Sequence, residues 1–151
     1  MPPLSRRSFI TATASLCLVR PAYADRHPVS TGSQGVAIQG YDTRAYWTDG
    51  AARKGRAANP VEWNGAPWYF ATSAEAATFA ATPARFAPQF GGFCTRAMSF
   101  KKVVDGDPEV WRIFEGKLYL FALPKGGKAF DESAAPMIAK AQAYWESLGY
   151  A

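Results

Sequence analysis

The sequence predicts an α+β fold, with a small antiparallel sheet built from two β-hairpins and covered by short helices and a C-terminal helix. Two stretches of alternating aromatic and aliphatic residues each contain a turn glycine, a pattern typical of hairpins. The last segment of the chain has apolar residues at helical spacing, which predicts an amphipathic helix lying on the sheet.

The first hairpin is centred on Asn64-Gly65. This dipeptide readily adopts the positive φ angles of a tight turn, and it separates Trp63 from the aromatic run at residues 68–70. Pro67 falls near the start of the second strand, where a missing N–H disturbs the strand pairing least. We therefore expect the chain to reverse direction at this point.

Short elements are expected on both sides of that hairpin. Residues 36–38 (Val-Ala-Ile) are a strand candidate, and Asp42 is expected to cap the helical turn that follows, with a catalytic role as the alternative. Ser73 is expected to cap an alanine-rich helix that ends before Pro83.

The C-terminal half repeats the alternation of strand and helix patterns. Residues 110–121 form the second predicted hairpin, with its turn at Glu115-Gly116. Residues 125–131 are predicted to form a short amphipathic turn, and residues 133–149 the terminal helix.

The N-terminus has the pattern of an export signal. Ser5-Arg6-Arg7-Ser8-Phe9-Ile10 is a twin-arginine motif, and an apolar stretch and a small-residue site at Ala22-Tyr23-Ala24 follow it. The apolar stretch is well short of the ~20 residues that a membrane-spanning helix needs. We expect residues 1–24 to be removed by cleavage, which leaves a periplasmic protein without a membrane anchor.

Composition then limits the functional classes. Cleavage would leave 127 residues (151 − 24) with 14 basic and 12 acidic side chains, a net charge of +2, so the sequence predicts one domain and favours no nucleic-acid partner. Cys94 would be the one remaining cysteine, so no intramolecular disulfide can form. Residues 25–35 are polar and rich in turn formers, and we expect a flexible arm.

Two sets of residues are candidate copper ligands. If residues 95–98 are helical, Cys94 and Met98 lie on one face, and two soft sulfur atoms can hold Cu(I); the alternative is that both belong to the apolar core. Cleavage after Ala24 would place His27 third in the chain, where the amine, two amides and the imidazole can surround Cu(II) or Ni(II). A solvated histidine is the alternative there.

Several motifs follow one another in a recognisable order. They are GYDTRAYW at residues 40–47, WNG and WYFA around the first hairpin, an S…F…P…F spacing after it, and GGFC at residues 91–94. Over residues 36–145 the chain resembles the YHS domain in its exported bacterial form. Together with the export signal and the arm, this divides the chain into residues 1–24, 25–35 and 36–151.

The resemblance implies less about chemistry than about fold. The YHS domains associated with metals have DPVC early and YFC after the hairpin, which supply a pair of thiolates. The matching stretches here end in Ala45 and Ala71, and alanine cannot coordinate a metal, so that site is not carried over. Cys94, within GGFC, resembles the exported branch of the family, and that branch has no settled activity.

Three hypotheses follow. The first is a periplasmic binding or accessory module whose pocket, for a small ligand or a partner protein, involves Asp42, Tyr69, Gly91, Gly92 and Cys94. The second is a copper handler that uses Cys94 with Met98, or His27. The third is an enzyme with Cys94 as its nucleophile; it is disfavoured because the sole histidine lies in the arm, which leaves Arg96 as the nearby cation.

Overall fold

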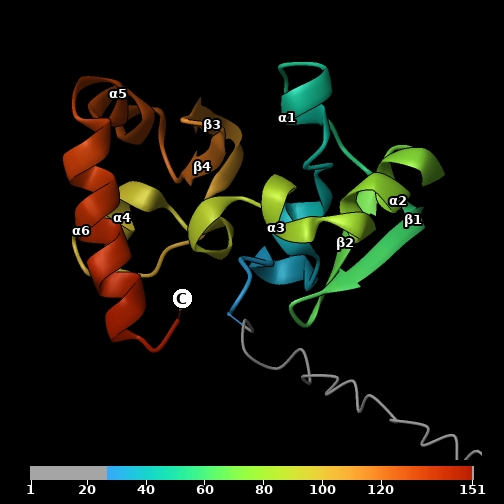
Figure 1. Cartoon of the computed structure of the whole chain (residues 1–151), viewed down its shortest axis with the longest axis horizontal. Helices are drawn as coiled ribbons and strands as arrows, with labels where there is room; N and C mark the ends of the chain where they lie inside the picture. Colours follow the sequence, from blue (N-terminus) through green and yellow to red (C-terminus); the bar gives the residue numbers. More distant parts are fainter. Residues whose placement is uncertain (1–26, 151) are drawn as a thin grey trace, which may run out of the picture.

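The computed structural model describes residues 27–150, and Figure 1 shows two halves side by side. The first half contains α1 (Ala45–Thr48), β1 (Arg56–Trp63), β2 (Ala66–Phe70), α2 (Ser73–Ala81) and α3 (Pro83–Phe86). The second half contains α4 (Thr95–Ser99), β3 (Asp107–Phe114), β4 (Lys117–Phe121), α5 (Pro124–Glu132) and α6 (Ala134–Ser147). The 3₁₀ turns are η1 (Gly32–Gln34), η2 (Ala37–Gly40) and η3 (Gln89–Gly92), of which η2 and η3 open the two halves.

The two halves are copies of one unit, which we call repeat 1 (residues 37–86) and repeat 2 (residues 89–147). The elements β3, β4 and α5 each begin 51 positions after β1, β2 and α2, and each has the length of its counterpart. Both hairpins also have an irregularity at the same place in the first strand. The sequence expectations did not include this duplication.

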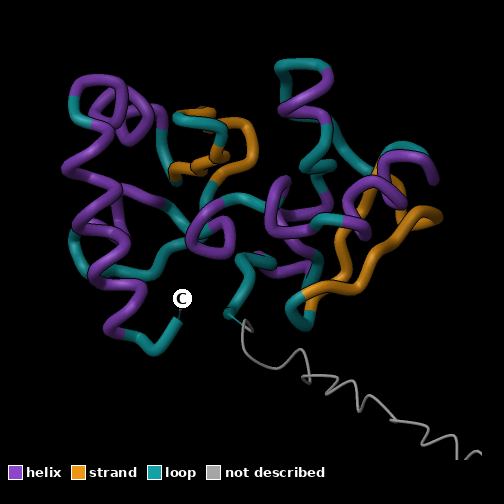
Figure 2. Tube along the Cα trace, in the orientation of Figure 1, coloured by secondary structure: helices purple, strands orange, loops and turns teal. Residues whose placement is uncertain are grey.

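The two predicted hairpins are confirmed. Asn64 and Gly65 have φ angles of 52° and 77°, and Glu115 and Gly116 have φ angles of 49° and 72°, so both turns have the left-handed geometry that favours asparagine and glycine. Each hairpin is a separate two-stranded antiparallel sheet (Figure 2). The α+β class is therefore confirmed, and the four strands make two small sheets where one was expected.

The predicted strand at residues 36–38 is wrong. The chain forms the tight turn η2 there, in which Ile38 and Gln39 have positive φ angles of 41° and 55°. Buried Ile38 donates its backbone N–H to the Ser30 oxygen at 2.8 Å. A run of three residues is too short to distinguish a strand from a buried turn by composition, and among residues 27–150 no strand pairs with it.

The predicted helices are confirmed with small shifts of their ends. Thr72, not Ser73, caps α2 by accepting a hydrogen bond from the Glu75 N–H at 3.2 Å. The predicted turn after residue 124 is the full helix α5, and α6 is the predicted C-terminal helix, with Ala141 and Trp145 on its buried face. Among residues 27–150 no helix is long and apolar enough to cross a bilayer.

Each repeat has its own apolar cluster. The first is built on the aromatic side chains of β2 and α2, with Phe79 stacking within 6 Å of Trp63, Trp68 and Phe70. The second joins β4, α4, α5 and α6 around Phe130. Leu118 and Leu120 of β4 belong to the first cluster, and Tyr119 and Phe121 of the same strand belong to the second, so β4 lies between the two cores.

Residues 27–35 do not form the flexible arm that the sequence predicts. They run between the two halves (Figure 1), and the Ser30 N–H donates to the Gly91 oxygen at 2.8 Å. Fully buried Ser30 also donates from its hydroxyl to Asp105 at 2.6 Å. Serine and glycine composition predicted mobility, but these hydrogen bonds hold the segment against both repeats. The predicted signal peptide lies outside the described residues.

Candidate functional site

A cleft with Cys94 in its wall opens on the surface of repeat 2, between the loop after α4 and the start of α5. Its volume is about 440 Å³, within the range of small-molecule sites. It is lined by Cys94, Arg96, Ala97, Phe100, Lys102, Val104, Ala122, Leu123, Lys125 and Gly126. We call it the Cys94 cleft.

Cys94 is held in place by the backbone around it. Its N–H donates to the Val104 oxygen at 2.8 Å, and its sulfur accepts a hydrogen bond from the Ala97 N–H at 3.4 Å as the N-cap of α4. The residue is 5% exposed, so the thiol is a buried wall of the cleft. The predicted helical turn after Cys94 is thereby confirmed.

The equivalent place in repeat 1 is occupied by an ion-pair cluster. The Arg53 guanidinium lies 2.6 Å from Asp49 and 2.6 Å from Glu75, and 3.5 Å from the fully buried carboxylate of Asp42. One arginine with three acidic partners thus fills the space between the start of α1 and the start of α2.

Backbone hydrogen bonds establish which residues correspond. The Asp42 N–H donates to the Arg53 oxygen, as the Cys94 N–H does to the Val104 oxygen. Gly55 likewise donates to Gly40 as Gly106 does to Gly92. Sequence supports the same alignment, since GYDTRA at residues 40–45 matches GFCTRA at residues 92–97 in its glycine, threonine, arginine and alanine.

The substitutions between the repeats open the cleft. Asp42 corresponds to Cys94 and Arg53 to Val104. Glu75, 51 positions before Gly126, corresponds to that glycine. All three residues of repeat 2 line the cleft, and none carries a charge. The side chains that fill the space in repeat 1 are therefore absent in repeat 2.

The start of α5 also lacks side chains that are present at the start of α2. Thr72 and Glu75 cap α2 together, because the Thr72 hydroxyl accepts from the Glu75 N–H and donates to the Glu75 carboxylate at 3.1 Å. Their counterparts are Leu123 and Gly126, and no side chain caps α5 within the described residues. The uncapped start of α5 borders the cleft.

The cleft has an apolar wall and a basic rim. Phe100 and Leu123 expose 65% and 53% of their surface, which is unusual for large apolar side chains. The cations Arg96, Lys102 and Lys125 line it, and none of the three forms an ion pair with any residue from 27 to 150. No acidic side chain is among the lining residues.

The five residues predicted to form one pocket are distributed over four places. Cys94 lines the cleft, while Asp42 belongs to the ion-pair cluster of repeat 1 and Tyr69 packs beside Gly40. Gly91 and Gly92 are buried in contact with the Pro28 backbone and the Ile38 side chain. The space predicted to be a pocket is filled by the 27–35 segment and η2.

Asp42 accepts a hydrogen bond from the turn that leads into α1, as the sequence predicts, while the N-cap residue of the helix itself is Arg44, which has no side-chain cap in the described part of the chain. One carboxylate oxygen accepts from the Arg44 N–H and the other from the Ala71 N–H, each at 2.8 Å. Burial raises the pKa of Asp42, and these two hydrogen bonds act in the opposite direction. All of its partners are structural, so the geometry gives no indication of acid–base catalysis.

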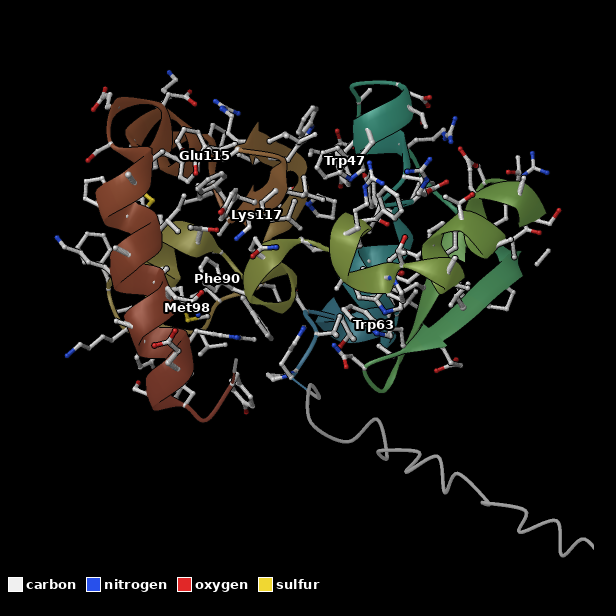
Figure 3. All side chains as sticks on the ribbon, in the orientation of Figure 1. Trp47, Trp63, Phe90, Met98, Glu115 and Lys117 are labelled. Carbon is white, nitrogen blue, oxygen red and sulfur yellow. The ribbon has the colours of Figure 1, made fainter. Side chains whose placement is uncertain are left out.

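The two alternative copper sites lie in different places. Cys94 and Met98 are one helical turn apart, as the sequence predicts, and both belong to the apolar cluster of repeat 2. Met98 is fully buried in the apolar cluster of repeat 2, beside α6 with Phe90 in Figure 3. His27 lies in a different cavity of about 400 Å³, between the rings of Trp63 and Trp145 and bonded to Asn64 at 3.0 Å. Within the described chain no three His, Cys, Asp or Glu residues could hold a metal ion together.

The alternative for an amino-terminal copper site depends on residues 25 and 26, which lie outside the described residues. Its imidazole is described, and both ring nitrogens of His27 have partners, Asn64 and the Pro28 oxygen. Coordination through the amine, two amides and the imidazole would have to compete with these contacts.

Sequence reasoning missed most of the lining of the cleft. Phe100, Val104 and Leu123 lie outside the predicted hairpins and helices, and none of the predicted sites included Lys102 or Lys125. The signal that could have found them is the recurrence of G-x-x-T-R-A, which places Cys94 at the position of Asp42.

Comparison with known proteins adds no relative. No protein-family model, no curated protein and no solved structure matches the chain.

Proposed function

We propose that this protein is an exported binding module of the YHS type, and that it holds a small ligand in the Cys94 cleft. The observation that carries the proposal is the contrast between the repeats. The same space is closed by Arg53 and its acidic partners in repeat 1 and is open, with exposed apolar walls, in repeat 2. An exposed concave apolar surface in a small protein marks a binding site more often than an accident of packing.

The arrangement of motifs supports the YHS part of the proposal. The two stretches that correspond to the family's thiolate pair, residues 42–45 and 69–71, meet through the hydrogen bond from the Ala71 N–H to Asp42 at 2.8 Å. Their counterparts in repeat 2 include Ala97 and Ala122, and both line the cleft. The cleft thus lies in repeat 2 at the place equivalent to the one that the resemblance marks in repeat 1, and both places have alanine where the family's metal site has cysteine.

Export through the twin-arginine route to the periplasm is part of the same proposal and depends on residues 5–24. Mass spectrometry of the N-terminus of protein recovered from the periplasm tests it directly, since the expected mature chain begins at Asp25. Elemental analysis of the same sample tests the copper alternative, for which stoichiometric copper would be the supporting result.

The binding proposal is tested with a neutral apolar fluorophore, phenylnaphthylamine, whose emission rises on transfer from water to an apolar site. The wild-type protein is expected to bind it with a saturable signal and to show slower alkylation of Cys94 by iodoacetamide in its presence. A double variant, Val104→Arg with Cys94→Asp, rebuilds the plug of repeat 1 and is expected to abolish the signal.

The control is Val103→Arg, which places an arginine at an exposed neighbour of Val104 that does not line the cleft. It should bind the fluorophore as the wild type does. Urea unfolding of the double variant shows whether it is folded, and the alkylation assay on wild-type protein does not depend on any variant. A fluorophore that neither binds nor protects Cys94 would refute the proposed function.

A further inference from the structure

The chemistry of the Cys94 cleft restricts the class of its ligand. One side of the cleft is apolar, with Phe100, Val104 and Leu123 exposed to solvent by 65%, 42% and 53%. A ligand that covers these side chains removes apolar surface from water on both partners. The ligand therefore has an apolar body.

The charged residues of the lining favour a ligand with negative charge. Arg96, Lys102 and Lys125 converge on the cleft from the α4 helix, the loop that follows it and the α5 helix. No aspartate or glutamate lines the cleft, and none pairs with these cations within the described part of the chain. A ligand with an anionic end meets three cations and no opposing charge.

Repeat 1 shows which chemical group is missing. There, the carboxylates of Asp42 and Glu75 lie in the equivalent space, and Glu75 also stands in the first turn of α2. In repeat 2 both carboxylates are gone, and α5 begins with no acidic residue in its first turn. A carboxylate brought by a ligand would restore the negative charge that the fold carries at this place in repeat 1.

We propose that the ligand of the Cys94 cleft is a small amphipathic carboxylate, an acyl chain or similar apolar body ending in one carboxylate. The apolar body lies on Phe100, Val104 and Leu123, and the carboxylate lies among Arg96, Lys102 and Lys125. This inference rests on the proposed binding function and names the ligand class for the same cleft.

The first test compares ligands of one chain length. Decanoate and decylamine below their micelle concentrations, and decanol below its solubility limit, are used to displace phenylnaphthylamine from the wild-type protein. Decanoate is expected to bind about tenfold more tightly than decanol, as one charge-assisted hydrogen bond would give, and decylamine is expected to bind least. Shortening the acid to octanoate is expected to weaken binding by about fourfold for each methylene that leaves the apolar wall.

Side-chain substitutions show which of the three cations bind the carboxylate of the ligand. Lys125→Gln, Lys102→Gln and Arg96→Gln are each expected to weaken the binding of decanoate more than that of decanol, and so to reduce the preference for decanoate. The matched control is Lys128→Gln, one turn further along α5 on an exposed residue outside the lining, which should keep the wild-type preference.

Cys94 provides a second test that does not depend on any chosen ligand. Iodoacetate and iodoacetamide are of similar size and alkylate the same thiolate, so the ratio of their rates cancels the ionisation and exposure of Cys94. Relative to a free thiol, the ratio at Cys94 is expected to favour iodoacetate severalfold at low ionic strength. Added salt should reduce this excess, because it screens the three cations.

The outcomes separate the two proposals. A protein that binds neither phenylnaphthylamine nor any of the three ligands refutes the proposed function itself. A protein that binds the neutral fluorophore, but binds decanoate no better than decanol and shows the free-thiol ratio at Cys94, keeps the binding function and overturns the carboxylate inference. Binding to vesicles of anionic lipid without binding of monomeric decanoate would assign the cleft to a membrane surface and also overturn it.

Discussion

Asp42 and Cys94 occupy the same position in the two repeats and do different things there. Each lies just before a short helix and accepts a hydrogen bond from a backbone N–H near its start. The carboxylate of Asp42 additionally reaches Arg53 and the Ala71 N–H, whereas the thiol of Cys94 has no such partners among residues 27–150. This exchange, together with those of Arg53 for Val104 and of Glu75 for Gly126, replaces a packed ion-pair centre by the wall of a cleft.

The role of Asp42 predicts the effect of Asp42→Asn. Both carboxylate oxygens accept from donors, so an amide must place its NH₂ group against either the Arg44 N–H or the Ala71 N–H. The free energy of unfolding, measured in urea, is expected to fall by about 2 kcal/mol.

The control is Asp131→Asn, which breaks the exposed pair with Arg112. Exposed ion pairs contribute little, so a loss of less than about 1 kcal/mol is expected. Equal losses at the two positions would show that burial of the Asp42 carboxylate is not what makes it important.

Gly91 allows a second prediction at this scale. Its φ angle is +62°, and a side chain there would overlap the backbone oxygen of Pro28. Gly91→Ala is expected to destabilise the protein by more than about 2 kcal/mol, because the 27–35 segment would have to move.

Gly65→Ala is the matched substitution. It has a similar φ of +77° but nothing within 4 Å of the new methyl group. It should cost only the conformational strain, about 1 kcal/mol. Thermal or urea unfolding of both variants makes the comparison, and equal stabilities would mean that the packed 27–35 segment contributes nothing.

At the scale of elements, each repeat is a turn, a hairpin and a helix that follows the second strand. The hairpins share turn geometry and the position of their irregularity, yet the helices that follow begin differently. Thr72 and Glu75 cap the start of α2, whereas the start of α5, which no side chain of the described residues caps, borders the cleft. The repeat thus conserves the scaffold and varies the helix start.

This difference is tested by Thr72→Ala. Loss of the hydroxyl that accepts from the Glu75 N–H is expected to lower the free energy of unfolding by about 1 kcal/mol. Thr78→Ala, at an exposed position in the same helix, should leave stability unchanged or raise it slightly, because alanine is the better helix former. Urea unfolding would reveal a misassigned cap if the two variants lost the same stability.

At the scale of the molecule, tyrosine hydroxyls link the two repeats. Tyr41 donates to the Glu109 carboxylate at 2.7 Å, and buried Tyr46 donates to the Pro108 oxygen at 2.9 Å. Leu120 of repeat 2 also packs in the apolar cluster of repeat 1. Together these contacts join the two repeats into one folded body.

The link through Tyr41 predicts how stability depends on pH. Its hydrogen bond to Glu109, together with burial, raises the pKa of Tyr41 from 10.0 to about 12. The folded state therefore keeps the phenol proton at pH values where the unfolded chain loses it, so stability is full below pH 10 and falls as pH rises from 10 to about 12.

Tyr41→Phe removes this contribution, so its unfolding free energy is expected to fall less steeply than that of the wild type over this interval. Tyr144→Phe is the control, because the Tyr144 hydroxyl has no hydrogen-bond partner within the described chain, and it should follow the wild type. Identical slopes for wild type and Tyr41→Phe in urea unfolding at several pH values would contradict the assignment.

The sequence predicted the structure correctly where neighbouring residues in the chain determine it. Asn64-Gly65 and Glu115-Gly116 specify their turns by backbone preference alone, and the alanine-rich and amphipathic segments specify their helices. The prediction failed at residues 36–38 and 27–35. The conformation there depends on the hydrogen bonds from Ile38 to Ser30 and from Ser30 to Gly91, which no local sequence pattern indicates.

The sequence by itself determined the α+β class, both hairpins and the C-terminal helix, because each follows from turn chemistry or from the spacing of apolar residues. Only the tertiary structure decided that the two halves are repeats, that Arg53 closes one copy of the cleft, and that the other copy is open. A cleft is the space left between side chains from segments far apart in the chain, and no local preference specifies such a space.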